Sequence, residues 1–321
     1  MPEEQVGFLP RPGTMPASTS ASAESITRDR GSILGALLES LRPAQWLKNG
    51  FVFAALIFSR SLFAWHRVYL VTLAALVFCG VAGAVYLLND VLDAAEDRQH
   101  PVKRQRPVAS GRLSARTALV ASALLGSVAL AGAWSLDRQF FFVIAIYAAL
   151  NALYSRFLKH VMLLDVFVIA AGFVLRVLGG GLVIHVAISP WLIVCTTLLA
   201  LFLALTKRRQ ELVLLGSNAA NHRASLANYS PYFLDQLIGI VTASTVMSYS
   251  LYTLSADVTA KFPGKRLELT IPFVLFGIFR YLYLVHQVSE GGNPTRLLLT
   301  DRVLLSIVVL WAVAVVLIIY L

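Results

Sequence analysis

The densest group of residues with chemical potential is an acidic run at the end of a long apolar segment. Asn89 and Asp90 begin this run, and Asp93 and Asp97 follow at helical spacing. At about 100° per residue, the three aspartates fall within about 60° of one another on a helix. Three carboxylates on one face at a membrane boundary repel one another unless a cation lies among them. Oxygen ligands of this kind suit Mg²⁺, although the run could also be a solvated acidic helix end.

A cationic segment follows directly and suggests a phosphate-bearing substrate. It places Lys103, Arg104 and Arg106 between Pro101 and Pro107. Carboxylates that hold a metal, next to cations that hold phosphate oxygens, suit a diphosphate with its Mg²⁺. The alternative is that these cations only mark the cytoplasmic side of a membrane, where Lys and Arg are abundant.

The scaffold that positions these residues must lie in a membrane. Of the 321 residues, 58% are hydrophobic and 14% are charged, and the mean hydropathy is +0.73. Soluble proteins are about 45–50% apolar and about 25% charged, so an ordinary soluble enzyme is excluded. Helices are the only open-chain structures that satisfy backbone hydrogen bonds in lipid, so the predicted class is an all-α integral membrane protein.

The apolar runs predict about nine transmembrane helices, each near the ~20 residues that cross the hydrocarbon. The predicted spans cover residues 43–64, 68–89, 116–135, 139–156, 162–184, 189–206, 235–255, 270–288 and 302–320. Residues 1–38 contain several prolines and no apolar period, so we expect a disordered cytoplasmic tail there. Residues 39–321 are expected to form one transmembrane catalytic domain.

The basic residues predict the orientation of the chain. With a cytoplasmic N-terminus, 19 of the 27 Lys and Arg residues fall on the cytoplasmic side and six on the opposite side. The positive-inside rule therefore favours a cytoplasmic N-terminus, an external C-terminus and a cytoplasmic acidic run. We expect about half of the net charge of +10 to reflect this topology alone. Nucleic-acid binding is not expected, because the chain has no recognition motif.

A second polar group follows the predicted sixth span, in what we expect to be a loop. It reads Thr206-Lys207-Arg208-Arg209-Gln210-Glu211-Leu212. Lys207 and Glu211 are four residues apart and could pair with one another. Even so, the three consecutive cations are expected to leave a net positive charge that repels a second metal ion and attracts a phosphate.

Four further cations lie within or beside the predicted spans. Lys48 is in the first span, Arg176 in the fifth and Arg280 in the eighth, and Lys159 precedes the fifth. An intramembrane arginine usually faces a cavity, so Arg176 and Arg280 either contact a phosphate or pair with a buried carboxylate. Lys159 could instead extend to the membrane interface. The run Gly179-Gly180-Gly181 predicts close helix packing.

The acidic and cationic runs together resemble the UbiA superfamily of intramembrane prenyltransferases. The residues that carry the resemblance are Tyr86-x-x-Asn89-Asp90-x-x-Asp93-x-x-x-Asp97 and Pro101-x-Lys103-Arg104-x-Arg106-Pro107. The resemblance covers about residues 41–321 and implies nine helices around a central cavity, with the first motif binding the Mg²⁺–diphosphate of an isoprenyl donor. A second aspartate-rich motif is typical of the family after its sixth helix, and this chain has cations and Glu211 there instead.

Three further motifs resemble the decaprenyl-phosphate phosphoribosyltransferase branch of that superfamily. They are Arg42-Pro43-x-Gln45-Trp46-x-Lys48-Asn49, Lys207-Arg208-x-x-Glu211-Leu212 and Asp301-Arg302-Val303-Leu304. In that branch the diphosphate belongs to phosphoribosyl pyrophosphate (PRPP), and the acceptor is a polyprenyl phosphate. The resemblance implies an Mg²⁺-dependent enzyme of a bacterial-type plasma membrane that makes polyprenyl-phosphoryl-5-phosphoribose for arabinan-type envelope precursors.

This interpretation assigns roles to specific residues. Asn89, Asp90, Asp93 and Asp97 hold the metal, and the three aspartates are catalytic. The expected substrate-binding residues are Lys48, Asn89, Lys103, Arg104, Arg106, Lys159, Arg176, Lys207, Arg208, Glu211 and Arg280. The alternatives are a prenyltransferase that moves an isoprenyl group from its diphosphate to an aromatic or other small acceptor, and a non-enzymatic transporter or lipid carrier. The polyprenyl chain length and the oligomeric state stay open.

Overall fold

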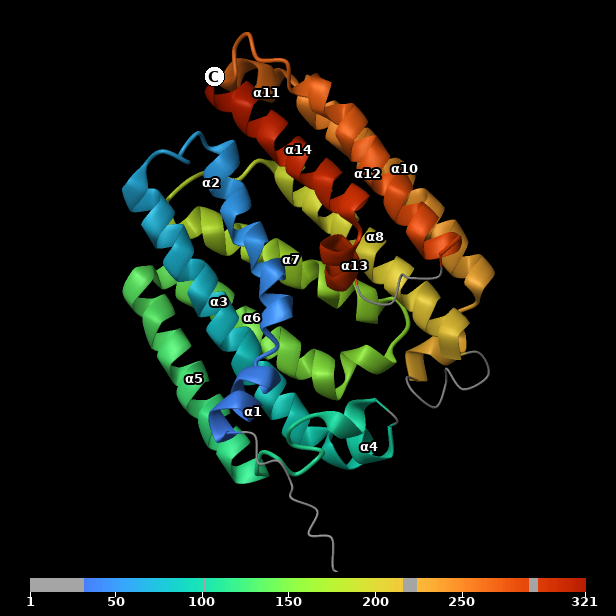
Figure 1. Ribbon diagram of the computed structural model, residues 1–321. Coiled ribbons are helices and arrows are strands. Elements are labelled where there is room, and N and C mark those ends of the chain that lie inside the picture. The colour runs from blue at the N-terminus through green and yellow to red at the C-terminus, as the bar shows by residue number, and fades with distance from the viewer. Residues whose placement is uncertain (1–31, 101, 216–223, 289–293) are drawn as a thin grey trace, which may run out of the picture.

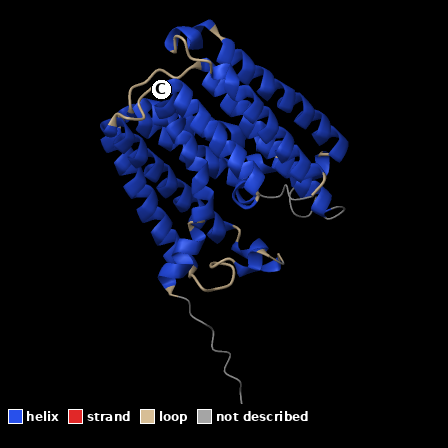
Figure 2. Cartoon of the chain, turned by 45° about the horizontal axis from the view of Figure 1, so that its top comes forward, coloured by secondary structure: helices blue, strands red, loops and turns tan. Residues whose placement is uncertain are grey.

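The computed structural model describes residues 32–100, 102–215, 224–288 and 294–321, and within them the chain is helical with no β-strand (Figures 1 and 2). The α-helices are α1 (Ile33–Ser40), α2 (Ala54–Phe58), α3 (Trp65–Leu92), α4 (Ala94–Gln99), α5 (Ala115–Leu136), α6 (Arg138–Arg156), α7 (Leu164–Val183), α8 (Pro190–Leu215), α10 (Pro231–Leu254), α11 (Ala256–Lys261), α12 (Ile271–His286), α13 (Pro294–Thr300) and α14 (Arg302–Tyr320). The 3₁₀-helices are η1 (Pro43–Phe53), η2 (Lys103–Gln105), η3 (Leu158–His160), η5 (Ala224–Asn228) and η6 (Leu267–Thr270). The predicted all-α class is confirmed.

Seven helices of the described chain are long and apolar enough to cross a membrane, so the protein is a multi-pass membrane protein. They are α3, α5, α7, α8, α10, the continuous η6–α12 segment and α14. The predicted span 139–156 coincides with α6, a single helix of 19 residues. This helix begins and ends on arginine and is less apolar than the seven.

The first predicted span, 43–64, is not one continuous helix. The 3₁₀-helix η1 covers its first 11 residues, and α2 ends at Phe58. Arg60 then adopts a left-handed backbone with φ of 58°. A 3₁₀-helix rises about 2.0 Å per residue, so η1 extends further into the bundle than an α-helix of the same length would.

Helix α7 is the centre of the bundle and packs on α6, α8 and η1. Two hydrophobic clusters meet on it, one formed with α8, α10 and α12 and the other with α3, α5 and α6. The predicted close packing at the glycine run is confirmed, because a Cβ on Gly180 would overlap the backbone carbonyl oxygen of Val52 in η1. The chain can bring η1 this near to α7 only where α7 has no side chain.

The elements that carry the polar motifs lie toward one end of the bundle. In Figure 1, α1 and α4 lie at this end, and the C-terminus lies beside α11 at the opposite end. Helix α1 begins at Ile33, so the last residues of the tail expected over 1–38 are helical. Residues 1–31 lie outside the described residues.

Candidate active site

The acidic run lies where α3 passes into α4. Asp93 makes the junction, with φ of −90° and ψ of 3°. Its amide donates to the carbonyl of Asn89 at 2.8 Å, and the amide of Asp97 donates to its carbonyl at 2.9 Å. The helical turn therefore continues through the junction. The side chains of Asp90 and Asp97 are only 2% and 4% exposed, whereas that of Asp93 is partly exposed.

Each of these carboxylates has a cationic partner from elsewhere in the chain. Arg106 Nη1 lies 2.7 Å from Asp97 Oδ2 and 3.5 Å from Asp90 Oδ1. Arg42 Nη2 donates to Asp90 Oδ1 at 2.5 Å. Lys159 Nζ lies 3.6 Å from Asp93 Oδ1. The mutual repulsion expected of the three acids is therefore offset by two arginines and a lysine.

The geometry of Asp90 and Asp97 suits a cation that both carboxylates share. One guanidinium nitrogen already contacts both of them. Mg²⁺ in proteins usually binds through one or two carboxylates, with waters and substrate phosphates as its other ligands. Among the described residues, no group of three or more His, Cys, Asp or Glu side chains forms a metal cluster. The donor set therefore fits a metal that arrives with a phosphate ligand rather than a closed protein cage.

The cationic run forms a short turn beside the acids. Lys103 is half-buried and Arg104 is exposed, and both lie on η2. The ring Nδ1 of His100 accepts the amides of Val102 and Lys103 and so fixes the start of this turn. Pro101 lies outside the described residues.

Lys48 lies in a cationic environment on η1. It is within electrostatic range of Arg42, Arg176 and Lys207. In the part of the chain that the structure describes, no carboxylate forms an ion pair with Lys48. Arg42 and Lys207 pair with Asp90 and Glu211, so the charges here without a carboxylate partner among the described residues are those of Lys48 and Arg176. Such positive charge attracts an anion.

Arg176 is a buried cation with neutral partners. Its guanidinium donates to Asn49 Oδ1, the Gly172 carbonyl and Tyr147 Oη, each at 2.7 Å. Within the described ranges, no ion pair joins Arg176 to a carboxylate. Three aromatic ring centroids also lie 4.8–5.8 Å from the guanidinium carbon, those of Phe78, Tyr147 and Phe173. The structure therefore shows no buried carboxylate partner for Arg176 among the described residues, and contact with a phosphate stays a prediction.

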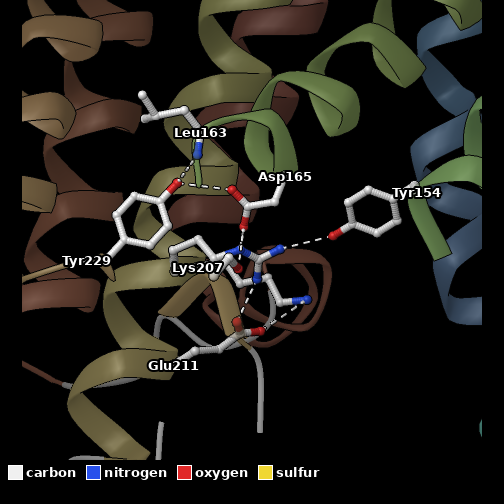
Figure 3. A network of polar contacts seen from close by, with 8 residues as sticks. Tyr154, Leu163, Asp165, Lys207, Glu211 and Tyr229 are labelled. Carbon is white, nitrogen blue, oxygen red and sulfur yellow. Dashed lines mark hydrogen bonds and ion pairs between the residues drawn. The ribbon is translucent and has the colours of Figure 1, made fainter. Parts of the chain in front are cut away.

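The second polar group lies on a helix and not on a loop, because α8 continues to Leu215. Arg208 is 1% exposed and donates to Asp165 Oδ2 at 2.7 Å and to Glu211 Oε2 at 2.5 Å (Figure 3). Tyr154 Oη accepts a third bond from Arg208 at 3.2 Å. Lys207 Nζ also lies 3.6 Å from Glu211 Oε1. The predicted pairing of Lys207 with Glu211 is present, and Arg208 shares the same acid.

The net positive charge expected at this group is not present. Arg209 donates to both oxygens of Asp235, at 2.5 and 3.3 Å, so each of the three consecutive cations has a carboxylate partner. The sequence could not indicate this, because Asp165 and Asp235 come from other helices. His286 Nε2 also contacts Asp235, and both residues line a cleft of about 620 Å³ between α10 and α12. No residue of the acidic run lines that cleft.

Tyr229 completes the buried network around Asp165. Its hydroxyl lies 3.0 Å from Asp165 Oδ1, to which it donates, and it accepts the amide of Leu163 at 2.9 Å (Figure 3). Leu163 has a positive φ of 67°, so this contact holds an unusual backbone in place at the start of α7. The sequence contains a signal that Asp165 has a specific role, because a carboxylate inside the predicted span 162–184 is unusual. Nothing in the sequence indicates a role for Tyr229.

Arg280 has a carboxylate partner. Its Nε and Nη2 donate to the two oxygens of Asp301 at 3.2 and 2.8 Å. Asp301 also accepts the amide of Leu304 and so caps α14. The hydrogen bond from Arg280 lowers the pKa of Asp301 below its ordinary value. Of the two roles predicted for Arg280, the structure displays the ion pair.

Arg42 contacts the acidic run, and sequence reasoning assigned it no role. It appeared in the Arg42-Pro43 motif, which was a usable signal. Its contact with Asp90 crosses 48 positions of the chain.

Comparisons with known proteins identify the family and the fold of this chain. The sequence matches the UbiA prenyltransferase family over residues 50–293. A decaprenyl-phosphate phosphoribosyltransferase of Corynebacterium glutamicum is 33% identical over 290 residues, which cover 88% of this chain and 86% of that one. One of Mycobacterium tuberculosis is 31% identical over 297 residues, with 90% and 96% covered. A UbiA homologue from Archaeoglobus fulgidus, solved with GPP and Mg²⁺, is similar in fold, with a TM-score of 0.67, 19% identity and coverage of 88% and 99%.

Proposed function

We propose that this chain, which belongs to the UbiA prenyltransferase family, transfers a 5-phosphoribosyl group from PRPP to a polyprenyl phosphate. The products are polyprenyl-phosphoryl-5-phosphoribose and pyrophosphate. The relatives named decaprenyl-phosphate phosphoribosyltransferase support this assignment, because they match nearly the whole chain. The site faces the cytoplasm of a bacterial-type plasma membrane in this proposal, with the N-terminus on the same side.

The observation that carries the proposal is the convergence of cations on Lys48. Lys48 interacts electrostatically with Arg42, Arg176 and Lys207, and no described carboxylate pairs with it. PRPP brings a diphosphate and a 5-phosphate, and the lipid acceptor brings one more phosphate. An isoprenyl diphosphate with an aromatic acceptor needs fewer cations. At the second polar group the carboxylates Glu211, Asp165 and Asp235 are matched by Lys207, Arg208 and Arg209. These pairs leave no net negative charge to attract a second metal ion.

The residues divide into two groups by what they bind. Asp90 and Asp97, with Asn89 and Asp93 beside them, would hold Mg²⁺, which when bound supplies positive charge at the leaving diphosphate. Lys103, Arg104, Arg106 and Lys159 neutralise further diphosphate oxygens. Lys48, Arg176 and Lys207 hold the remaining phosphates. Arg208 orients Glu211 and thereby Lys207. Arg280 orients Asp301, which caps α14.

The proposed reaction is a direct displacement at C1 of the ribose. The C1–O bond to pyrophosphate breaks while an oxygen of the lipid phosphate forms a new bond from the opposite face. Charge like that of an oxocarbenium ion develops at C1, as in glycoside cleavage. The acceptor phosphate is already anionic near neutral pH, so no strong general base is needed. Positioning by the cations supplies most of the rate enhancement.

A single-turnover assay tests this function. Purified protein in detergent is mixed with labelled PRPP and polyprenyl phosphate, with and without Mg²⁺. We expect Mg²⁺-dependent transfer of label to the lipid, lost in Asp93→Ala and retained in Glu96→Ala, which removes an exposed acid from the same turn. Turnover of a polyprenyl diphosphate with an aromatic acceptor, and none with PRPP, would overturn the proposal in favour of conventional prenyl transfer.

A further inference from the structure

Arg42 is held in an unusual conformation beside the acidic run. Its φ of 52° and ψ of 63° lie in the left-handed region, which non-glycine residues seldom occupy. The guanidinium donates to Asp90 Oδ1 and lies 4.8 Å from the centre of the Tyr86 ring. A strained backbone of this kind persists where its surroundings fix it, and such positions cluster at functional sites.

Arg42 and Arg106 cover two buried carboxylates from the solvent side. The side chains of Asp90 and Asp97 are nearly inaccessible, whereas those of Arg42 and Arg106 are 30% and 27% exposed. A buried carboxylate needs a counterion. In this structure the two guanidiniums supply it.

The two arginines contact the same carboxylates that would hold a divalent cation. Asp90 Oδ1 contacts both Arg42 and Arg106, and Arg106 reaches Asp97 as well. Two guanidiniums and a divalent cation repel one another at this distance, so each weakens the binding of the other to these carboxylates. The arginines and the metal therefore compete for Asp90 and Asp97.

We infer that Arg42 and Arg106 are exchangeable counterions. They pair with Asp90 and Asp97 in the substrate-free chain, and they turn to the diphosphate when these carboxylates bind a divalent cation. The planar guanidinium suits both partners, because it binds carboxylate and phosphate oxygens with the same pair of N–H groups. The inference rests on the proposed function only in that the substrate carries a diphosphate, and it adds Arg42 to the residues that bind it.

This exchange makes an unusual prediction about binding of the metal alone. Removing the charge of Arg42 removes a competitor, so Arg42→Gln should bind Mn²⁺ about tenfold more tightly in the absence of substrate. The same variant should bind inorganic pyrophosphate about tenfold more weakly in excess Mg²⁺, because a phosphate ligand is lost. The two affinities change in opposite directions.

The experiment uses the full chain in lipid nanodiscs, with Mn²⁺ binding followed by electron paramagnetic resonance and pyrophosphate binding by calorimetry. Arg42→Lys keeps the charge and should keep Mn²⁺ affinity near that of the unaltered protein. Arg116→Gln is the matched control, because it removes the charge of an exposed arginine in the first turn of α5, outside the acidic run and the cationic turn. Both of its affinities should be unchanged.

Unchanged or weaker Mn²⁺ binding by folded Arg42→Gln would overturn the inference and leave the pair a purely structural one. The same changes in affinity are expected for Arg106→Gln, which replaces Arg42→Gln in the experiment if that variant does not fold. Neither Mn²⁺ nor pyrophosphate distinguishes PRPP from an isoprenyl diphosphate. If the phosphoribosyl assay fails, the counterion exchange can still be correct. If the Mn²⁺ and pyrophosphate measurements contradict the exchange, the phosphoribosyl assay still tests the proposed function independently.

Discussion

Arg208 of α8 donates a 2.7 Å hydrogen bond to Asp165 of α7, although 43 residues separate the two. Both side chains are buried. Figure 3 shows the polar network around Asp165 to which the pair belongs. The pair fixes the end of α8 against the start of the central helix. Lys207 and Glu211, one helical turn of α8, are positioned by this contact.

Asp165→Asn should destabilise the protein by about 3–5 kcal/mol, because removal of one partner leaves a buried guanidinium without full compensation. Unfolding of the purified protein in detergent, followed by denaturant or heat, measures this loss. Glu268→Gln is the control, since its partner Arg266 is exposed and such pairs contribute little. Equal stability of Asp165→Asn and the unaltered protein would mean that Glu211 alone compensates Arg208.

Gly180→Ala should weaken the bundle, because its methyl group would overlap the carbonyl oxygen of Val52. Backbone cannot move aside as a flexible side chain can, so a cost of about 1–3 kcal/mol or more is expected. The matched control is Gly239→Ala on α10, where nothing lies within 4 Å of the added carbon. The unfolding temperatures of the two variants and the unaltered protein measure this cost. Equal unfolding temperatures for all three would refute the close contact.

Lys48→Gln should raise the KM for the phosphate-bearing acceptor about tenfold or more, with a smaller effect on kcat. Hydrogen bonds to charged groups contribute about 1.5–3 kcal/mol, and 1.4 kcal/mol corresponds to a factor of ten. Lys48→Arg should restore most of the affinity. Steady-state kinetics with varied acceptor measure the split, and Lys261→Gln at the opposite end of the bundle should behave as the unaltered protein. An unchanged KM for both substrates would remove Lys48 from the binding site.

The ion pair of Arg280 with Asp301 should make part of the stability depend on pH. Arg280 lowers the pKa of Asp301 from its ordinary value of 3.8, so the folded state favours the ionised carboxylate. Its contribution is complete above 3.8 and is lost as the pH falls through the lowered value. Asp301→Asn keeps an oxygen to cap α14 and should be less stable at pH 7 by about 1 kcal/mol or less.

Unfolding temperatures of Asp301→Asn and the unaltered protein, measured from pH 7 down to pH 3, should move closer together below pH 3.8, as the carboxylate begins to be protonated. A difference that stays constant across this range would show that the carboxylate charge is not what stabilises the junction of α13 and α14.

Transfer by direct displacement should invert the configuration at C1 of the ribose. The acceptor oxygen attacks from the face opposite the leaving pyrophosphate. In this mechanism no covalent enzyme intermediate forms, so a second inversion at C1 does not occur. Nuclear magnetic resonance of the isolated lipid product reads the anomeric configuration directly. A product that keeps the configuration of PRPP would require two successive displacements.

Much of the fold followed from local pattern. Long apolar runs can satisfy their backbone in lipid only as helices. Seven of the predicted spans lie within a few residues of helices in the structure, namely 68–89, 116–135, 139–156, 162–184, 235–255, 270–288 and 302–320. The family could also be identified from the sequence, because its acidic and cationic motifs are each contiguous in the chain. Interruption of the span at 43–64 was not predicted, since hydropathy does not register 3₁₀ geometry or the left-handed Arg60.

The amino-acid sequence by itself determined that this chain is a helical membrane protein. It also placed an acidic motif, of residue types that ligate metal ions, directly before a cationic segment. Only the tertiary structure decided how the charges pair. Asp165 neutralises Arg208 and Asp235 neutralises Arg209, whereas Lys48 is left among other cations. Charge density along the chain is a local property, but the charge at a site depends on which helices pack together. The partners here are 26 and 43 positions apart, beyond the reach of any local pattern.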